Sequence, residues 1–189
     1  MSSSGISYLL LDGGGAAERE DDLLALAAEV GGAGAAGTGA DAAAARRAAL
    51  VRRRQPGFAL AEARHGAYLV GYASGLPLRP STSWWRGLTT PLPPDVTAEH
   101  PGRTFALTEL LVRASWRRQG IGRELHDLLL GGRAEERATA LVPPGATAAQ
   151  RAFASWGWRK TARTRGDDPD APDAEVLDVL LIGLPGPAV

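Results

Sequence analysis

The chain has 189 residues and no cysteine, and its 21 Lys and Arg residues balance 21 Asp and Glu residues to a formal net charge of +0. The length suits one domain with a sizeable core, and 44% hydrophobic with 22% charged residues is ordinary for a globular protein. The balanced charge argues against a general nucleic-acid binder. The lack of cysteine excludes disulfides, thiolate metal sites and a cysteine nucleophile, and three scattered histidines make a catalytic zinc unexpected.

Neither a membrane span nor an export signal is expected from the sequence. No stretch approaches the roughly 18–20 uninterrupted apolar residues that a membrane-spanning helix needs. The first residues, Met1–Gly5, lack the basic region and apolar core of a signal peptide, so we expect a cytoplasmic protein without membrane or nucleic-acid partners. Arginine replaces lysine everywhere except at Lys160, a composition typical of a GC-rich bacterial genome.

The first half of the chain predicts strands and helices that lead into a long loop. In chain order, apolar spacing bounded by glycine and proline predicts a strand over 6–12 ended by Gly13–Gly15, helices over 16–30 and 41–54, and strands over 58–64 and 67–74. The dipeptide His65-Gly66 joins the last two strands as a hairpin. Residues 75–102 follow as a proline-rich inserted loop centred on Trp84 and Trp85. A structureless loop of this length is uncommon inside a domain and is often functional.

The second half alternates strands with helices. The pattern predicts strands over 105–112 and 137–142, helices over 121–130 and 147–156, and a closing pair of strands over 159–164 and 175–184. The sequence shows no internal repeat and no domain boundary. We therefore expect an α/β (α+β) chain with one domain over 1–189 and flexible ends at about 1–5 and 185–189.

The segment Arg117-Arg118-Gln119-Gly120-Ile121-Gly122 is the most informative motif of the chain. It lies between an apolar strand and an amphipathic helix. A strand that turns through glycines into a helix N-terminus presents backbone N–H groups and a positive dipole end to an anion, which suits a pyrophosphate. The third glycine of the dinucleotide fingerprint is missing and the loop lies late in the chain, so a nucleotide-dependent oxidoreductase is disfavoured. No Gly-Lys-Ser/Thr occurs, so the segment is not a P-loop.

This motif resembles motif A of the GCN5-related N-acetyltransferase (GNAT) superfamily, Arg/Gln-x-x-Gly-x-Gly/Ala, which follows a strand ending Glu-Leu-x-Val, here Glu109 to Val112. A second block over 146–158 resembles the family's Asn-x-x-Ala-x-x-x-Tyr-x-x-x-Gly-Phe, with Ala149, Gly157 and Trp158 in register. The two blocks occur in the right order and together cover roughly half of the chain. The resemblance implies a GNAT-like domain, in which about four helices flank a mixed sheet of about seven strands whose fourth and fifth strands run parallel and splay apart.

The resemblance also implies the donor and its binding residues. Acetyl-CoA would be the acyl donor, lying in the splay between the fourth and fifth strands. On the family template, the loop that binds the pyrophosphate consists of Arg117, Arg118, Gln119, Gly120, Ile121, Gly122 and Arg123. The strand residues whose backbone pairs with pantetheine are Leu111 and Val112. Phe153 is the aromatic residue that lines the cofactor site. Arg113 adds a fourth arginine to the loop region, and we expect at least two of the four to be simply solvated.

Acyl transfer to an amine requires a base, because an ammonium group with a pKa near about 10.4 has no lone pair for attack. Glu109, in the apolar strand close to the expected thioester, is the candidate general base. The alternative is that it pairs with an arginine or points out of the sheet edge. The family's tyrosine, which usually protonates the departing thiolate, is Phe153 here, and the family's asparagine is Ala146. We expect an N-acetyltransferase that moves acetyl directly to a primary amine of a small molecule or peptide in a ternary complex. The alternative is a non-catalytic acyl-CoA-binding module.

The acceptor side is poorly marked. Four aspartates, including Asp167 and Asp168, lie in the loop between the last two strands, which borders the acceptor cleft on the family template. They would attract a cationic amine electrostatically, or they form a solvated turn. Trp84 and Trp85 could form an apolar wall for the acceptor, a homodimer contact or a part of the core. His126 is expected to pack or to face solvent rather than to catalyse.

Overall fold

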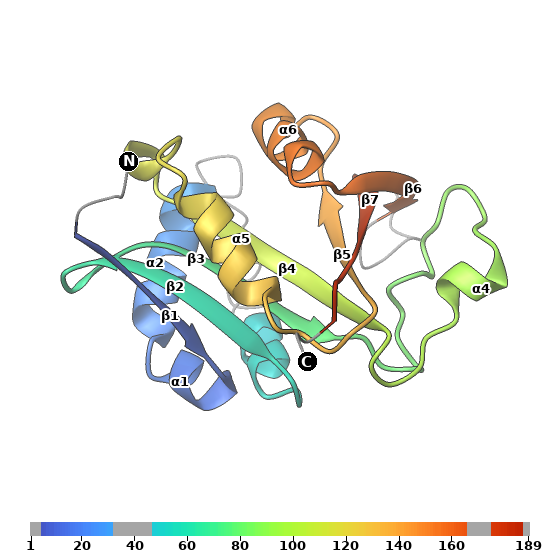
Figure 1. Ribbon diagram of the computed structural model, residues 1–189, viewed down its shortest axis with the longest axis horizontal. Helices are drawn as coiled ribbons and strands as arrows, with labels where there is room; N and C mark the ends of the chain where they lie inside the picture. Colours follow the sequence, from blue (N-terminus) through green and yellow to red (C-terminus); the bar gives the residue numbers. More distant parts are fainter. Residues whose placement is uncertain (1–4, 32–46, 166–174, 187–189) are drawn as a thin grey trace. The chain divides into compact units, whose positions relative to one another are not determined.

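The computed structural model describes residues 5–31, 47–165 and 175–186. Its strands are β1 (Ile6–Leu11), β2 (Ala59–His65), β3 (Tyr68–Pro77), β4 (Thr104–Val112), β5 (Arg137–Val142), β6 (Arg159–Arg165) and β7 (Val176–Gly183). Its helices are α1 (Gly13–Ala17), α2 (Glu20–Gly31), α4 (Pro94–Thr97), α5 (Ile121–Leu130) and α6 (Thr147–Ser155), with a 3₁₀ turn η1 (Ala114–Trp116) and a further helix over 47–53 (Figure 1).

The strands form a seven-stranded mixed sheet in the order β1-β2-β3-β4-β5-β7-β6. β4 and β5 are parallel, with Thr104–Leu107 paired to Arg137–Ala140, and β4 then continues to Val112. The pairs β1–β2, β2–β3, β5–β7 and β6–β7 are antiparallel. The predicted mixed sheet with parallel fourth and fifth strands is therefore confirmed.

The chain divides into two compact units, and each is described by itself. The first unit contains Met1–Leu76 and Thr108–Gly131, and the second unit contains Pro77–Leu107 and Gly132–Val189. The first unit thus holds the end of β4, the glycine motif and α5. The second unit holds β5, α6, β6 and β7.

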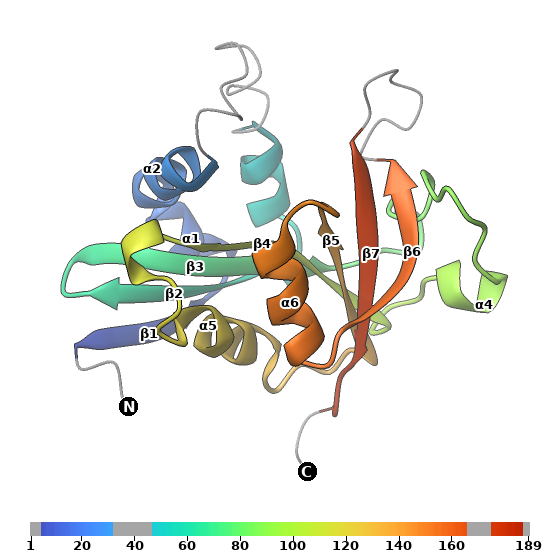
Figure 2. The same cartoon turned by 90° about the horizontal axis from the view of Figure 1, so that it is seen from above.

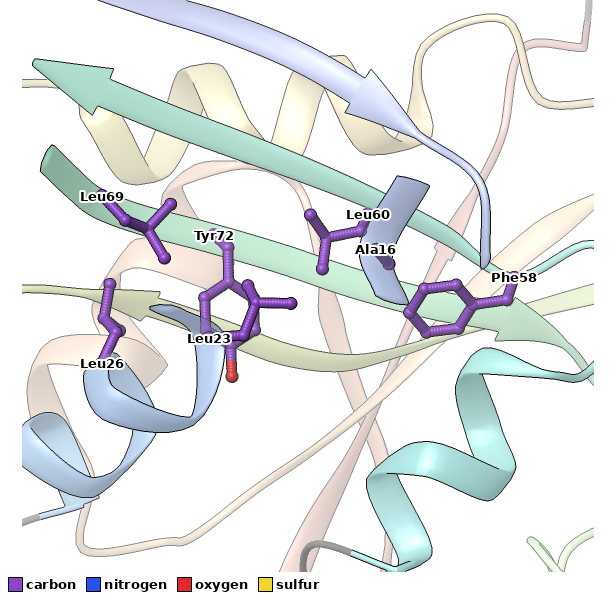
Figure 3. Close-up of a cluster of buried hydrophobic side chains, with 7 residues drawn as sticks. All are labelled: Ala16, Leu23, Leu26, Phe58, Leu60, Leu69 and Tyr72. Carbon is purple, nitrogen blue, oxygen red and sulfur yellow. The ribbon is translucent and has the colours of Figure 1, made fainter. Parts of the chain in front are cut away.

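In the first unit, helices cover both faces of β1 to β3 (Figure 2). Strand alternation directs Leu60 and Tyr72 to the face covered by α1 and α2, where they pack with Leu23 and Leu26 (Figure 3). α5 contacts β1 and β2 on the opposite face. Gly71 allows this close packing, because a Cβ there would lie 3.2 Å from a methyl of Leu125 and 2.8 Å from the carbonyl oxygen of Leu111.

The first helical segment differs from the predicted helix over 16–30. α1 begins at Gly13, inside the glycine run that was expected to be a loop, and a break before Glu20 separates it from α2. The cause is Asp12, whose Oδ1 accepts the Gly15 N–H at 2.9 Å and so caps the helix. A single capping carboxylate offsets the low helix propensity of three glycines.

In the second unit, the segment predicted as a structureless loop is largely packed. Leu78 and Trp85 from this segment join Ala106, Ala162 and Val179 in a buried cluster. β3 extends to Pro77, α4 forms within the segment, and Leu88 forms an isolated bridge with Thr164 of β6. The bridge is flanked by backbone hydrogen bonds from Thr89 to Arg163 and from Arg165 to Gly87.

Gly87 is required at that bridge, since a Cβ there would lie 2.3 Å from the Arg165 carbonyl oxygen. The segment around Gly87 therefore covers part of an edge strand that would otherwise present open hydrogen-bonding groups.

The other predicted elements agree closely with the structure where it describes them. β5 and α5 occupy the predicted residues, and the bounds of β2, β4, α6, β6 and β7 differ from prediction by about one residue, within the usual ambiguity of helix and strand ends. The predicted helix over 41–54 is described from residue 47, and the outermost predicted flexible residues lie outside the described part. Within the described ranges, no helix combines the length and apolarity needed to cross a membrane.

Candidate functional site

Glu109 lies on the second half of β4 and is held by β3 in the first unit. Its Oε2 accepts a hydrogen bond from the Ser74 hydroxyl at 2.9 Å. Ser74 is 1% exposed, and its backbone carbonyl accepts the Thr108 hydroxyl at 3.2 Å. The half-buried Glu109 carboxylate is thus oriented by a hydroxyl of the neighbouring strand.

Tyr72 is a second neighbour of Glu109. Its side chain is 1% exposed and packs in the core cluster of the first unit. Burial and the charge of Glu109 raise the pKa of Tyr72, against the opposing charges of Arg53 and Arg52. Tyr72 therefore stays a neutral hydroxyl near Glu109. A carboxylate has about four acceptor positions, so the hydrogen bond from Ser74 leaves acceptor capacity for a substrate N–H.

The glycine motif forms a tight turn between β4 and α5. Gly120 is the N-cap of α5 with φ of 86°, in the left-handed region, and no side chain caps the helix there. Arg118 is also left-handed, with φ of 63°, a conformation that is strained for a residue with a Cβ. The Gly120 carbonyl accepts the N–H groups of Arg123 and Glu124, so the amides before Arg123 precede the first intrahelical bond. The turn presents amides of Gly120, Ile121 and Gly122 at a positive helix end.

The four arginines of this region have different surroundings. Arg113 is buried, donates Nε–H to the Leu69 carbonyl at 2.7 Å, pairs with Glu29 and lies over the Tyr68 ring. Arg113, which follows β4 directly, therefore connects the end of this strand to β3 through Leu69 and to α2 through Glu29.

The other three arginines are exposed. Arg117 donates to the Val112 carbonyl at 2.9 Å, and Arg123 pairs with Asp127 at 2.6 Å. Arg117 and Arg118 flank the turn, and the Gln119 side chain donates to the Ser115 carbonyl at 3.2 Å. The motif therefore has cationic side chains at the protein surface, next to the backbone amides of the α5 N-terminus.

α5 is anchored by its buried side and carries His126 on it. Ile121, Leu125 and Leu129 are each at most 1% exposed. His126 is 5% exposed with Nδ1 2.7 Å from Asp127. Burial lowers the pKa of His126, and Asp127 opposes this only partly. The predicted packing role of His126 agrees with this position.

Phe153 lies on α6 in the second unit. It is 4% exposed, and its ring meets Trp158 edge-on at a centroid distance of 5.1 Å and Trp156 at 5.5 Å. Ala146, at the position of the family's asparagine, is the N-cap of α6 and makes no side-chain cap. The Gln150 amide instead donates to the Pro143 carbonyl and to Asp178, both at 3.2 Å, which ties α6 to the end of β5 and to β7.

The predicted acceptor residues are only partly described. Trp85 is 9% exposed and donates Nε1–H to Glu99 at 3.0 Å, and the half-buried Trp84 donates to Thr139 at 3.3 Å. Both indoles thus have partners inside the second unit, and their contact with an acceptor or a second copy stays a prediction. Asp167 and Asp168 lie outside the described residues.

Two residues around Glu109 were not found by reasoning from the sequence, Tyr72 and Ser74. A tyrosine and a serine in an apolar strand carry no motif. The available signal was the alternation of β3, which places residues 72 and 74 on one face. That signal does not say which residue of β4 lies opposite.

Comparisons with known proteins agree with this arrangement. The model of the acetyltransferase (GNAT) family matches residues 33–158. A sequence comparison with curated proteins gave no match.

Solved structures with the same fold are numerous but distant in sequence. The ribosomal-protein-S18-alanine N-acetyltransferase of Escherichia coli is 12% identical with a TM-score of 0.62, covering 95% of this chain and 94% of that one. The diaminobutyrate acetyltransferase of Paenibacillus lautus, solved with L-2,4-diaminobutyric acid and coenzyme A, is 17% identical with a TM-score of 0.58 and 95% coverage of both chains. The protein yncA of Salmonella typhimurium, solved with its cofactor acetyl-CoA, is 17% identical with a TM-score of 0.57 and 98% coverage of both chains.

At these identities the solved structures show the fold alone. The family match, by contrast, covers well over half of the chain and includes the glycine motif, Glu109 and Phe153. The chain belongs to the GNAT acetyltransferase family.

Proposed function

We propose that this protein transfers acetyl from acetyl-CoA directly to a primary amine of a small molecule or peptide, with both substrates bound at once. One observation carries the proposal. A single strand, β4, presents Glu109, which accepts a hydrogen bond from the Ser74 hydroxyl, and then leads through Val112 to the uncapped N-terminus of α5. A candidate base and an anion-binding turn are therefore spaced along one rigid element.

The turn fits the phosphates of coenzyme A. The amides of Gln119 to Arg123 surround a helix end without a side-chain cap, and Arg117 and Arg118 are exposed beside it. Such a helix end favours a pyrophosphate through hydrogen bonds and through its dipole. Leu111 and Val112 are the strand residues whose backbone we assign to the pantetheine arm. The acetyl-CoA of the Salmonella yncA structure and the coenzyme A of the Paenibacillus structure support acetyl-CoA as the donor.

Glu109 is the proposed general base. When bound, acetyl-CoA supplies the activated acetyl group. Glu109 takes one proton from the acceptor ammonium, which frees the nitrogen lone pair. The amine then attacks the thioester carbonyl, and the new C–N bond forms as the C–S bond breaks and coenzyme A leaves as a thiolate. The surplus proton on the nitrogen passes through water to that thiolate. Ser74 keeps the carboxylate in one orientation during this step. A positioned base contributes typically 10²–10⁴-fold to such a rate.

Phe153 supports a second candidate function, a non-catalytic acyl-CoA-binding module. The family tyrosine that protonates the thiolate is replaced by a buried ring without a hydroxyl, and Ala146 replaces the family asparagine. A thiol has an ordinary pKa near about 8.5, so water can protonate the leaving group in a slower enzyme. The two candidate functions can be distinguished by experiment, because only the transferase forms an acetylated amine.

We assign the acceptor side to the aspartates Asp167 and Asp168 and to Trp84 and Trp85, as the family template implies. A homodimer, a cytoplasmic location and a bacterial origin stay predictions.

The test is an acetyl-CoA consumption assay against a broad panel of primary amines, with mass detection of the acetylated product. We expect turnover of at least one amine, and its loss in Glu109→Gln near neutral pH. Tight binding of coenzyme A without any product on the whole panel would favour the binding module.

A further inference from the structure

β1 is an edge strand of the sheet, and within the described part of the chain only β2 pairs with it. The β1–β2 register is antiparallel and unbroken, from Ile6 opposite His65 to Leu11 opposite Leu60. β1 is the outermost strand of the first unit in Figure 2. The outer side of an edge strand presents a row of backbone N–H and C=O groups, which is a template for a further strand.

The side chains of β1 do not protect this edge. The strand, Ile6–Leu11, contains no charged residue and no proline. Leu9 is 49% exposed and Leu10 is 45% exposed, and strand alternation directs them to opposite faces of the sheet. Leu9 shares its face with Leu11, which packs against the core cluster of α1 and α2. Leu10 shares its face with Tyr8, on the side toward α5. Both faces of the edge are therefore apolar and accessible.

β6, the strand at the other end of the sheet order, is built differently. It carries four basic side chains: Arg159, Lys160, Arg163 and Arg165. The bridge between Leu88 and Thr164 also covers part of it. Charged side chains and a covering segment are devices that prevent unwanted pairing of an edge, and two copies joined through β6 would bring like charges together. β1 has no charge to oppose its pairing with a second β1.

A second copy of this chain fits the β1 edge in one register. A two-fold axis perpendicular to the sheet makes two β1 strands antiparallel and keeps each side chain on its own face, so opposite residues are an even number of positions apart. With the axis at Leu9, residues 7–11 of both copies pair, Leu9 lies opposite Leu9 of the partner subunit, and Leu10 lies opposite the partner's Tyr8. An axis at Tyr8 would place Leu9 opposite Ser7, and an axis at Leu10 would pair residues 9–11 alone. The register centred on Leu9 therefore gives both exposed leucines an apolar partner over the longest stretch.

We propose that β1 is an interface between two copies of this chain, in which the two β1 strands pair antiparallel about a two-fold axis at Leu9. The inference is independent of the proposed acetyltransferase function, because it uses neither Glu109 nor the glycine turn. Pairing satisfies the open backbone groups of both edges and removes the leucines from water. A standard interface has about 20–30 residues a side, more than one strand supplies, so the dissociation constant should lie in the micromolar range.

Sedimentation velocity of the full-length protein over a dilution series tests this interface. We expect wild type to pass from dimer to monomer on dilution. Leu9→Lys and Leu9→Glu should each weaken the dimer at least tenfold, because the two-fold axis places like charges opposite each other and the leucine contact is lost. An equimolar mixture of the two variants should recover the dimer, since the introduced charges are then opposite in sign. Val51→Lys, at a 59% exposed position of the helix over 47–53, is the matched control and should leave the equilibrium unchanged.

Leu9→Cys provides an independent check, because the chain has no cysteine of its own. Opposite residues of an antiparallel pair have Cβ atoms about 4.5–5.5 Å apart, close to the span of a disulfide. Mild oxidation should therefore link Leu9→Cys chains into covalent dimers and leave Val51→Cys chains monomeric.

Three outcomes would overturn the inference. Wild type that stays monomeric at every concentration would leave the β1 edge to a strand of another protein. A dimer that Leu9→Lys does not weaken would have to form through another surface. A mixture of the Lys and Glu variants that stays monomeric, with Leu9→Cys chains that do not cross-link, would exclude the pairing centred on Leu9.

Discussion

Ser74 on β3 gives its only hydroxyl proton to Oε2 of Glu109 on β4, at an oxygen–oxygen distance of 2.9 Å. The Thr108 hydroxyl lies 3.3 Å from the Ser74 hydroxyl and 3.2 Å from the Ser74 carbonyl oxygen. The single Thr108 proton goes to the Ser74 carbonyl, and the single Ser74 proton goes to Glu109. Thr108 and Glu109, two successive residues of β4, are therefore both hydrogen-bonded to Ser74 of β3.

Ser74→Ala tests whether this contact orients Glu109. We expect kcat to fall about tenfold, the size of one lost hydrogen bond to a charged group, with the KM for acetyl-CoA unchanged. In a Glu109→Gln background the same change should add little, because residues acting through one another are not additive. Ser7→Ala, at an exposed position of β1, is the matched control and should leave kcat unchanged. Full additivity of the two substitutions would contradict the positioning role of Ser74.

Gly122→Glu tests the anion-binding turn. A carboxylate in the first turn of α5 is favourable for the helix dipole, so the variant should fold. The same carboxylate repels and obstructs a pyrophosphate. Calorimetry should show coenzyme A binding weakened by at least a hundredfold. Gly183→Glu is the control, because nothing lies within 4 Å of the Cβ position there and affinity should be preserved. Unchanged affinity in Gly122→Glu would place the phosphates elsewhere.

Asp178 should make the stability of the protein depend on acid pH. Burial alone would raise the pKa of this carboxyl, but hydrogen bonds from Lys160 at 2.6 Å and Arg163 at 3.1 Å lower it. A carboxyl with a lowered pKa in the folded state stabilises the protein above its unfolded-state pKa, about 3.9, and this contribution is lost as pH falls through the folded-state pKa.

Asp178→Asn should therefore lower the free energy of unfolding at pH 7 by about 1–3 kcal/mol, and urea titrations should show the gap to wild type closing below about pH 4. A gap that stays constant down to pH 2 would mean that packing, and not the charge of Asp178, provides the stability.

The sequence predicted the strands and the glycine motif well because their signals are local. Apolar runs bounded by glycine located β4 and β5, and helical spacing from Ile121 located α5. The start of α1 was predicted wrongly, because one carboxylate of Asp12 outweighs the propensity of three glycines. The segment before β4 was predicted without structure, because its order depends on partners distant in sequence, such as Thr164 for Leu88.

The candidate site was predictable only where the family motif names residues. Glu109 and the turn residues follow from local sequence, whereas the partners of Glu109 depend on which residues of β3 lie beside β4. The role of Arg113 could not be predicted for the same reason. In the sequence it is grouped with the arginines near the expected phosphate site, whereas in the structure it pairs with Glu29 and donates to the Leu69 carbonyl. A sequence shows which residues are charged, but it does not show with which residue each of them forms an ion pair.

Phe153→Tyr tests whether the missing family hydroxyl limits the reaction. If Phe153 occupies the place that the family gives its tyrosine, the added hydroxyl can protonate the leaving thiolate. We then expect kcat to rise about tenfold or more with coenzyme A affinity nearly unchanged. Phe58→Tyr makes the same chemical change at a buried ring of the first unit that is 6% exposed, and it should lower stability without raising kcat.

Glu109→Gln should act in the opposite direction to Phe153→Tyr. The variant loses most of its kcat at pH values where the amine is protonated, and it recovers at high pH, where the amine deprotonates without a base. Initial rates of both variants across pH 6 to 10 decide the matter. If Phe153→Tyr leaves kcat unchanged and Glu109→Gln is silent at every pH, neither side chain takes part in proton transfer. With no wild-type turnover on the amine panel as well, the acyl-CoA-binding module becomes the better account of a chain that keeps the turn and lacks the acid.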